Sequence, residues 1–155
     1  MNTLKAGQMA PDFTLIDQHQ QNIRLSEQLS EHRVLVYFYP KAMTPGCTVQ
    51  ACSLRDTNTE LLALGVRTMG ISTDSPARLA KFAERDQLNF TLLADEDHKV
   101  AEAFGVWGLK KFMGKEYDGI HRLSFLINQD GTIAKVFDNF KTKDHHQVVL
   151  DYLKS

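Results

Sequence analysis

Cysteine is scarce in this sequence, with two residues among 155, and so few exclude a small fold held together by a network of disulfides. The sequence also lacks an excess of charge of either sign. Its net charge of −1 creates no broad field that would attract nucleic acid or an anionic membrane. No apolar run approaches the length of a membrane span, and the charged first 25 residues contain no signal-peptide pattern. Repeats are also absent. We therefore expect one cytoplasmic domain over residues 1–155, with neither a nucleic-acid nor a membrane partner.

Strand and helix patterns alternate along the chain. Residues 34–39 (VLVYFY) form an unbroken apolar run, typical of a strand that is covered on both faces. The pairs Thr44-Pro45 and Ser75-Pro76 are typical helix starts, and Gly65 is placed to end the first helix. We predict strands at 13–16, 22–25, 34–39, 66–72, 90–93, 122–127 and 132–137, and helices at 45–64, from 75, at 99–104 and near 148–153.

This order of elements predicts an α/β fold, in which a mixed central β-sheet is flanked by helices and preceded by an N-terminal β-hairpin. The segment 109–119 combines glycine, lysine and aromatic residues, and no element is assigned to it.

The chemistry is expected at the carboxyl end of the strand 34–39, where ligands usually bind in open α/β sheets. If Thr44 is the N-cap and Pro45 the first helical residue, Cys47 is the third residue of the first turn. Unpaired backbone N–H groups and the helix dipole favour an anion at that place. The sequence therefore predicts a reactive thiolate at Cys47.

Ionisation alone would not make Cys47 a fast nucleophile. Full ionisation raises the thiolate fraction at pH 7 by about 30-fold, but the accompanying fall in nucleophilicity removes roughly 10- to 18-fold. The site must therefore also stabilise a leaving oxygen with preplaced donors. Thr44 Oγ1, the N–H groups of Gly46 and Cys47, and a cation are the candidates.

The spacing of Cys47 and Cys52 carries a second prediction. Five residues along a helix separate the Cα atoms by about 8.5–9 Å, whereas a disulfide needs a separation below about 7 Å. If both cysteines lie on the helix, they can bridge only after its first turn or two have unwound.

The pattern of Pro40, Thr44 and Cys47, with Cys52 five residues later, resembles the peroxiredoxins, and among them the PrxQ branch of bacterioferritin comigratory proteins. The similarity extends over nearly the whole chain. It includes the segments Ala10-Pro11-Asp12-Phe13, Tyr37-Phe38-Tyr39-Pro40, Gly70-Ile71-Ser72, Phe104-Gly105-Val106 and Arg122-Leu123-Ser124-Phe125-Leu126-Ile127.

The resemblance implies a thioredoxin-like fold and reduction of hydrogen peroxide or organic hydroperoxides without metal or other cofactor. It assigns Cys47 as the peroxidatic cysteine and Cys52 as the resolving cysteine. Thr44 would hydrogen-bond thiolate and peroxide, Pro40 would shield the sulfur from water, and Arg122 would supply the cation. Thioredoxin is the implied reductant, with glutaredoxin as the alternative.

Two departures from the family pattern are relevant. Many relatives carry Glu where this chain has Gln50, so a charge contact near the arginine is absent or replaced. No later cysteine exists, so a partner subunit cannot supply the resolving thiol. An intrasubunit disulfide and a monomer are therefore expected.

Each of these residues also has a purely structural interpretation. Cys47 and Cys52 could be buried apolar side chains, Thr44 only a helix cap, Pro40 a strand end and Arg122 a surface ion-pair residue.

Other functions remain open. The six histidines fall on predicted turns and helix surfaces, without the spacing of metal ligands. A thiol–disulfide oxidoreductase would normally have two residues between its cysteines, whereas here there are four. A redox-sensing or chaperone-like module is the alternative outside enzymes.

Overall fold

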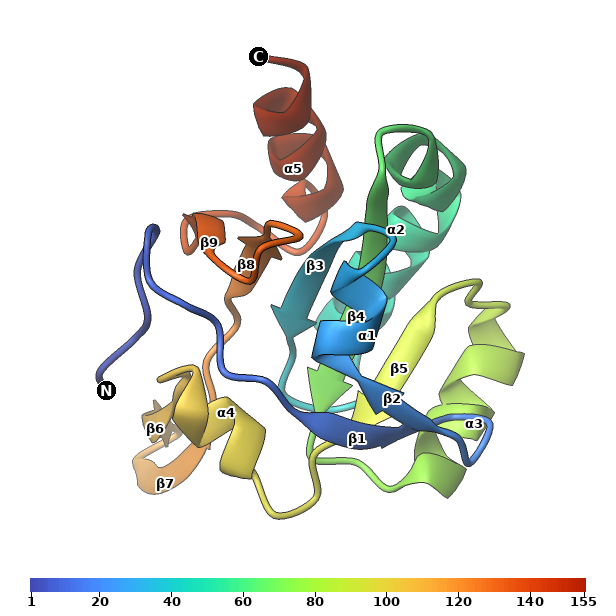
Figure 1. Cartoon of the computed structure of the whole chain (residues 1–155). Coiled ribbons are helices and arrows are strands. Elements are labelled where there is room, and N and C mark those ends of the chain that lie inside the picture. Colours follow the sequence, from blue (N-terminus) through green and yellow to red (C-terminus); the bar gives the residue numbers. More distant parts are fainter.

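The computed structural model describes all 155 residues, and its centre is a seven-stranded mixed sheet in the order β2-β1-β5-β4-β3-β8-β9 (Figure 1). The middle of the sheet is parallel, consisting of β3 (Arg33–Phe38), β4 (Val66–Ser72) and β5 (Thr91–Ala94). Antiparallel hairpins complete both edges, and they are formed by β1 (Thr14–Asp17) with β2 (Asn22–Arg24) and β8 (Ser124–Ile127) with β9 (Ile133–Phe137). The predicted mixed sheet and N-terminal hairpin are confirmed.

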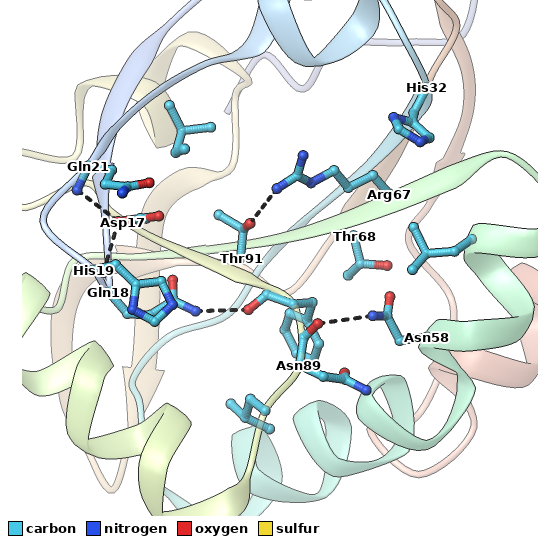
Figure 2. Close-up of a pocket in the computed structure, with 14 residues that line it drawn as sticks. Asp17, Gln18, His19, Gln21, His32, Asn58, Arg67, Thr68, Asn89 and Thr91 are labelled. Atoms are coloured by element: carbon cyan, nitrogen blue, oxygen red, sulfur yellow. Dashed lines mark hydrogen bonds between the residues drawn. The ribbon is translucent and has the colours of Figure 1, made fainter.

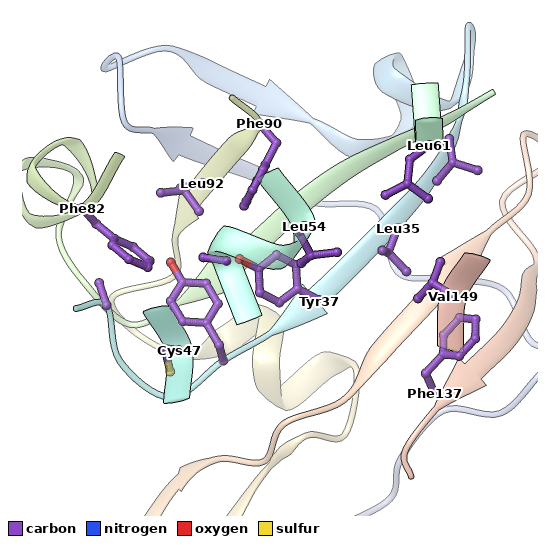
Figure 3. Close-up of a cluster of buried hydrophobic side chains, with 14 of the residues drawn as sticks. Leu35, Tyr37, Cys47, Leu54, Leu61, Phe82, Phe90, Leu92, Phe137 and Val149 are labelled. Atoms are coloured by element: carbon purple, nitrogen blue, oxygen red, sulfur yellow. The ribbon is translucent and has the colours of Figure 1, made fainter. Parts of the chain in front are cut away.

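Helices cover both faces of the sheet. Alternate side chains of β3 point to opposite sides, and since those on both sides are apolar, each face needs a cover. Leu35 and Tyr37 pack in one buried cluster with side chains of the helices α2, α3 and α5, whereas Val34 and Val36 pack in a second cluster with α1 and α4. In the first cluster, Phe82 and Val149 lie toward opposite ends (Figure 3). The helices are α1 (Leu25–Leu29), α2 (Pro45–Ala63), α3 (Pro76–Asp86), α4 (Lys99–Ala103) and α5 (His145–Lys154).

One glycine makes the packing of the first cluster possible. A Cβ on Gly70 of β4 would lie 2.8 Å from ring carbons of Tyr37, which is closer than real Cβ contacts come. The ring of Tyr37 therefore lies directly against the backbone of the neighbouring strand, and no larger residue fits at position 70 without displacing it.

The predicted helix signals at both ends of α2 are confirmed. Thr44 is its N-cap with extended dihedrals, and Gly65 has a φ of +79° just beyond its end, the left-handed conformation for which glycine is favoured. Ser75 caps α3 by accepting a hydrogen bond from the backbone N–H of Arg78. None of the five helices combines the length with the apolar character that a membrane span requires.

Two parts of the structure were not predicted. The expected strand 22–25 ends at Arg24, because Leu25 begins the five-residue helix α1 and is buried together with Leu29. Within the unassigned segment lies a separate hairpin of β6 (Trp107–Phe112) and β7 (Lys115–Ile120). Positive φ angles at Met113 and Gly114 form its two-residue turn.

Candidate active site

Cys47 lies where the sequence predicts it, as the third residue of α2 after the loop that follows β3. The first intrahelical bond runs from the N–H of Thr48 to the carbonyl of Thr44, at 2.9 Å. The N–H groups of Gly46 and Cys47 precede that bond, so they have no acceptor within the helix. They face the start of α2, where the helix dipole favours negative charge.

Thr44 occupies the N-cap position, but its side chain does not cap the helix. Its Oγ1 donates to the carbonyl oxygen of Lys41 at 2.8 Å, and it accepts no backbone N–H of α2. The hydroxyl stabilises the preceding turn instead. Because its only proton is used there, the expected donation from Thr44 to a thiolate or a leaving oxygen is wrong for this conformation. The N–H groups of the first turn stay free of side-chain caps.

Cys47 is a buried residue, and Cys52 is half-buried. The Cys47 residue is 2% exposed and belongs to the apolar cluster below α2, at whose edge it lies (Figure 3). Both thiols are free, and both residues are on the uninterrupted helix α2. Their five-residue spacing keeps the Cα atoms about 8.5–9 Å apart, so this conformation is not one in which they could bridge.

Arg122 extends from the segment before β8 to the start of α2. Its Nη2 lies 3.6 Å from the position that a Cβ on Gly46 would take. Its Nη1 donates to Oε1 of Gln50 at 2.6 Å. Arg122 and Cys47 both influence the buried phenol of Tyr37, whose pKa is raised first by burial, then by the neighbouring Tyr39 and Cys47, and is lowered by Arg122. The structure thus brings the predicted arginine to the predicted cysteine.

Pro40 is half-buried at the start of the loop between β3 and α2. The loop is fixed through Ala42, which is fully buried and bonded at both backbone groups. The N–H of Ala42 donates to Asp74 Oδ2 at 2.8 Å, and its carbonyl accepts from Arg78 Nη2 at 3.0 Å. Asp74 and Arg78 also form an ion pair at 3.0 Å. The sequence analysis does not predict this clasp, meaning the contacts of Asp74 and Arg78 with the backbone of Ala42 and with each other. The position of Asp74 just after a parallel strand is the signal that could have indicated it.

A second cation lies beside Arg122. Lys110 of β6 donates from Nζ to the carbonyl of Ile120 at 2.8 Å. Burial and the charge of Arg122 lower the pKa of Lys110, while Cys47 acts in the opposite direction. The β6–β7 hairpin therefore contributes to the electrostatics of the site.

One histidine contradicts the expectation that all six lie on turns and helix surfaces. His145, the first residue of α5, is fully buried. Its ring nitrogens face Gln50 Nε2 at 3.1 Å and Ser124 Oγ at 2.7 Å. Burial lowers its pKa to about 3, with smaller effects in the same direction from His146 and Arg122. The prediction failed because Val148 and Val149 revealed the apolar face of α5, whereas the burial of its first residue depends on contacts with β8.

Nowhere do three or more His, Cys, Asp or Glu side chains converge as metal ligands would. A cavity of about 500 Å³ opens at the far end of α2, lined by polar side chains that include Asn58, Arg67 and Asn89 (Figure 2). Asn58 follows Cys47 by 11 residues, which corresponds to about 16 Å along a helix. This cavity is therefore separate from the cysteine site.

Comparison with known proteins agrees with the site. The family model described as the AhpC/TSA family matches residues 6–136. Peroxiredoxin Bcp of Escherichia coli is 64% identical over 154 residues, covering 99% of this chain and 98% of that protein. The crystal structure of peroxidoxin BcpB from Mycobacterium tuberculosis has 38% identity and a TM-score of 0.86, with 97% of each chain covered.

A third relative connects the fold to an activity. The bacterioferritin comigratory protein of Xanthomonas campestris, described for its alkyl peroxide reduction activity, has 29% identity and a TM-score of 0.85, and the match covers 92% of this chain and 90% of that one. The thioredoxin-like fold implied by the resemblance is thereby confirmed. The chain belongs to the AhpC/TSA family, among its Bcp or PrxQ peroxiredoxins, and is a thiol peroxidase.

Proposed function

We propose that Cys47 is the sulfur that attacks peroxide. The observation that carries the proposal is its place in the first turn of α2, with free N–H groups and the Arg122 guanidinium beside it. The thiolate attacks one peroxide oxygen and the O–O bond breaks, leaving a sulfenic acid on Cys47. The other oxygen leaves as alkoxide or hydroxide and takes up a proton to give alcohol or water. Preplaced donors stabilise that developing charge.

The neighbouring residues have distinct roles in this step. Arg122 stabilises the leaving oxygen, because its charge is fixed and its donors form a rigid fork. Thr44 Oγ1 donates to Lys41, so its lone pairs are available to accept the peroxide O–H. Pro40 limits the access of water to the sulfur. Alkyl hydroperoxides are included among the substrates because the Xanthomonas campestris relative is described by that activity.

Cys52 resolves the sulfenic acid in the second step. Its thiol attacks the sulfur of Cys47, the S–OH bond breaks, and water leaves as the disulfide forms. Because the helix holds the two residues too far apart, the first turns of α2 unwind before this step. Unwinding breaks the hydrogen bond from Arg85 Nη2 to Thr48 Oγ1, at 2.9 Å, as well as the contacts of Gln50.

Amide exchange tests this unwinding. Protection over residues 48–55 should be high in the reduced protein and lost in the oxidised protein, while α3 stays protected in both states. Equal protection of residues 48–55 in both states would exclude the unwinding step.

The reductant is proposed to be thioredoxin, with glutaredoxin as the alternative. It supplies two thiols, forms a mixed disulfide with the chain, and restores both cysteines. We further propose that residues 1–155 act as one domain and as a monomer in the reducing cytoplasm, since both cysteines of the disulfide come from the same helix.

The decisive experiment follows peroxide consumption with thioredoxin, thioredoxin reductase and NADPH. Cys47→Ser should abolish turnover, whereas Cys52→Ser should consume about one peroxide per chain and then stop at the sulfenic acid. Full activity of Cys47→Ser would refute the assignment. Reduction of insulin without peroxide turnover would indicate an oxidoreductase, and slow oxidation without turnover a redox sensor.

A further inference from the structure

A buried chain of polar side chains runs from Arg122 into the protein. Arg122 Nη1 contacts Gln50 Oε1 at 2.6 Å, Gln50 Nε2 contacts His145 Nδ1 at 3.1 Å, and His145 Nε2 contacts Ser124 Oγ at 2.7 Å. Gln50, His145 and Ser124 are all fully buried. Residues from α2, α5 and β8 are thus joined behind the guanidinium, on the side away from solvent.

The direction of each hydrogen bond follows from the chemistry of the groups. A guanidinium can only donate, so the amide of Gln50 must present its oxygen to Arg122. The amide nitrogen then faces His145, and since it too can only donate, Nδ1 must accept. The neutral ring therefore carries its proton on Nε2 and donates it to Ser124 Oγ. Reversing any member of this chain would place two donors or two acceptors against each other.

The ring of His145 is held firmly enough to impose this order. It stacks on Phe140 at a centroid distance of 4.2 Å and lies 5.9 Å from the ring of Tyr37. Burial keeps the ring neutral near pH 7, since its pKa is lowered to about 3. A neutral ring keeps the lone pair on Nδ1 that the Gln50 amide requires.

We propose that His145 is a positioning residue of the peroxidase reaction, which fixes the Gln50 amide so that its oxygen holds the Arg122 guanidinium beside Cys47. This inference rests on the proposed role of Arg122 as the cation that stabilises the leaving oxygen. A carboxylate at position 50 would present an acceptor in either orientation, whereas an amide presents its oxygen to Arg122 only while a second partner, an acceptor, holds its nitrogen on the other side. His145 is that partner. Unwinding of the first turns of α2 would move Gln50 away and release Arg122 until the helix re-forms.

Two matched substitutions separate this role from simple packing. His145→Asn places an amide oxygen near the position of Nδ1, so it keeps the acceptor for Gln50. His145→Gln reaches the position of Nε2, so it keeps the contact with Ser124 and loses that acceptor. The readout is the rate constant of a single turnover of the reduced protein with hydrogen peroxide, measured by rapid quenching and thiol counting. Urea unfolding confirms that each variant is folded.

We expect His145→Gln to slow the oxidation of Cys47 by about tenfold, the effect of losing the charge-assisted hydrogen bond between Arg122 and a Gln50 amide that is no longer held. His145→Asn should stay within about threefold of the wild type. Adding Gln50→Glu to His145→Gln should restore most of the rate. Equal rates in the two variants, or no rescue by Gln50→Glu, would overturn the proposal.

One measurement does not depend on the variants. In the wild-type protein, ¹⁵N spectra of the His145 ring should show the proton on Nε2, and a proton on Nδ1 would overturn the proposal. If Cys47→Ser still turned over peroxide, the proposed function itself would be wrong. That outcome is independent of the His145 variants.

Discussion

Lowering the pH from 8 to 5 should weaken the folded state through one side chain, His145. The ring is fully buried, and burial lowers its pKa to about 3 in the folded protein, compared with about 6.5 in an unfolded chain. Between these values the unfolded state binds the proton and the folded state does not. The free energy of unfolding therefore falls as the pH falls below about 6.5. The loss from this residue alone reaches about 2 kcal/mol at pH 5.

The neighbours of His145 support the direction of this effect. His146 on the same helix and Arg122 from the segment before β8 both lower the pKa of the ring, as burial does. Asp144 acts in the opposite direction, and its effect is smaller than each of these. Tyr37 of β3, which also packs on the ring, has a raised pKa and stays neutral.

Urea unfolding at pH 8, 7, 6 and 5 measures this effect. The difference in unfolding free energy between the wild type and His145→Asn should shrink by about 2 kcal/mol from pH 8 to pH 5, because the variant lacks the titrating ring. The cost of the altered packing is the same at every pH and cancels. His19→Asn, which removes an exposed histidine, is the matched control for the substitution itself. A difference that stays constant within about 0.5 kcal/mol would refute the reasoning.

Three further results are expected. Gly70→Ala should lower the free energy of unfolding by about 1–3 kcal/mol, because its Cβ would lie 2.8 Å from the Tyr37 ring; unchanged urea unfolding would contradict this packing. Asp74→Ala should speed amide exchange at Ala42 by about tenfold, because the buried N–H loses its acceptor, and unchanged exchange would show that the clasp is unimportant. Arg122→Ala should slow peroxide reduction by about 100-fold or more. That loss of rate should persist at a pH where the thiolate absorbance of Cys47 has reached its plateau. If the rate of Arg122→Ala recovered at high pH, the only role of the arginine would be to promote ionisation of the thiol.

The parts of the fold that could be predicted are those with strong local signals. β4 is predicted with its observed bounds, 66–72, because the helix-ending Gly65 before it and the Ser75-Pro76 helix start after it leave few alternatives for a short segment. The β6–β7 hairpin was missed because most of its side chains are exposed, so no alternation of polar and apolar residues marks the strands. Helix α1 has only five residues, too few for a helical period to be recognised.

The residues of the site also divide into those that local sequence signals predict and those that they do not. The positions of Thr44 and Cys47 on α2 follow from local helix-capping rules. Arg122 is 72 residues from Gln50, and His145 is 95 residues from it, so no local pattern connects them. The family resemblance indicated Arg122, but His145 required the three-dimensional structure.

The placement of both cysteines on one continuous helix also affects the redox balance of the enzyme. The proposed disulfide between Cys47 and Cys52 could exist only while part of α2 is unwound. Its formation is therefore opposed by the free energy that the turns recover when they re-form. Each 1.4 kcal/mol or so of that recovery raises the reduction potential of the disulfide by about 30 mV. A well-packed α2 start therefore makes the oxidised enzyme a stronger oxidant toward its thiol partner, and folding energy helps to complete each catalytic cycle.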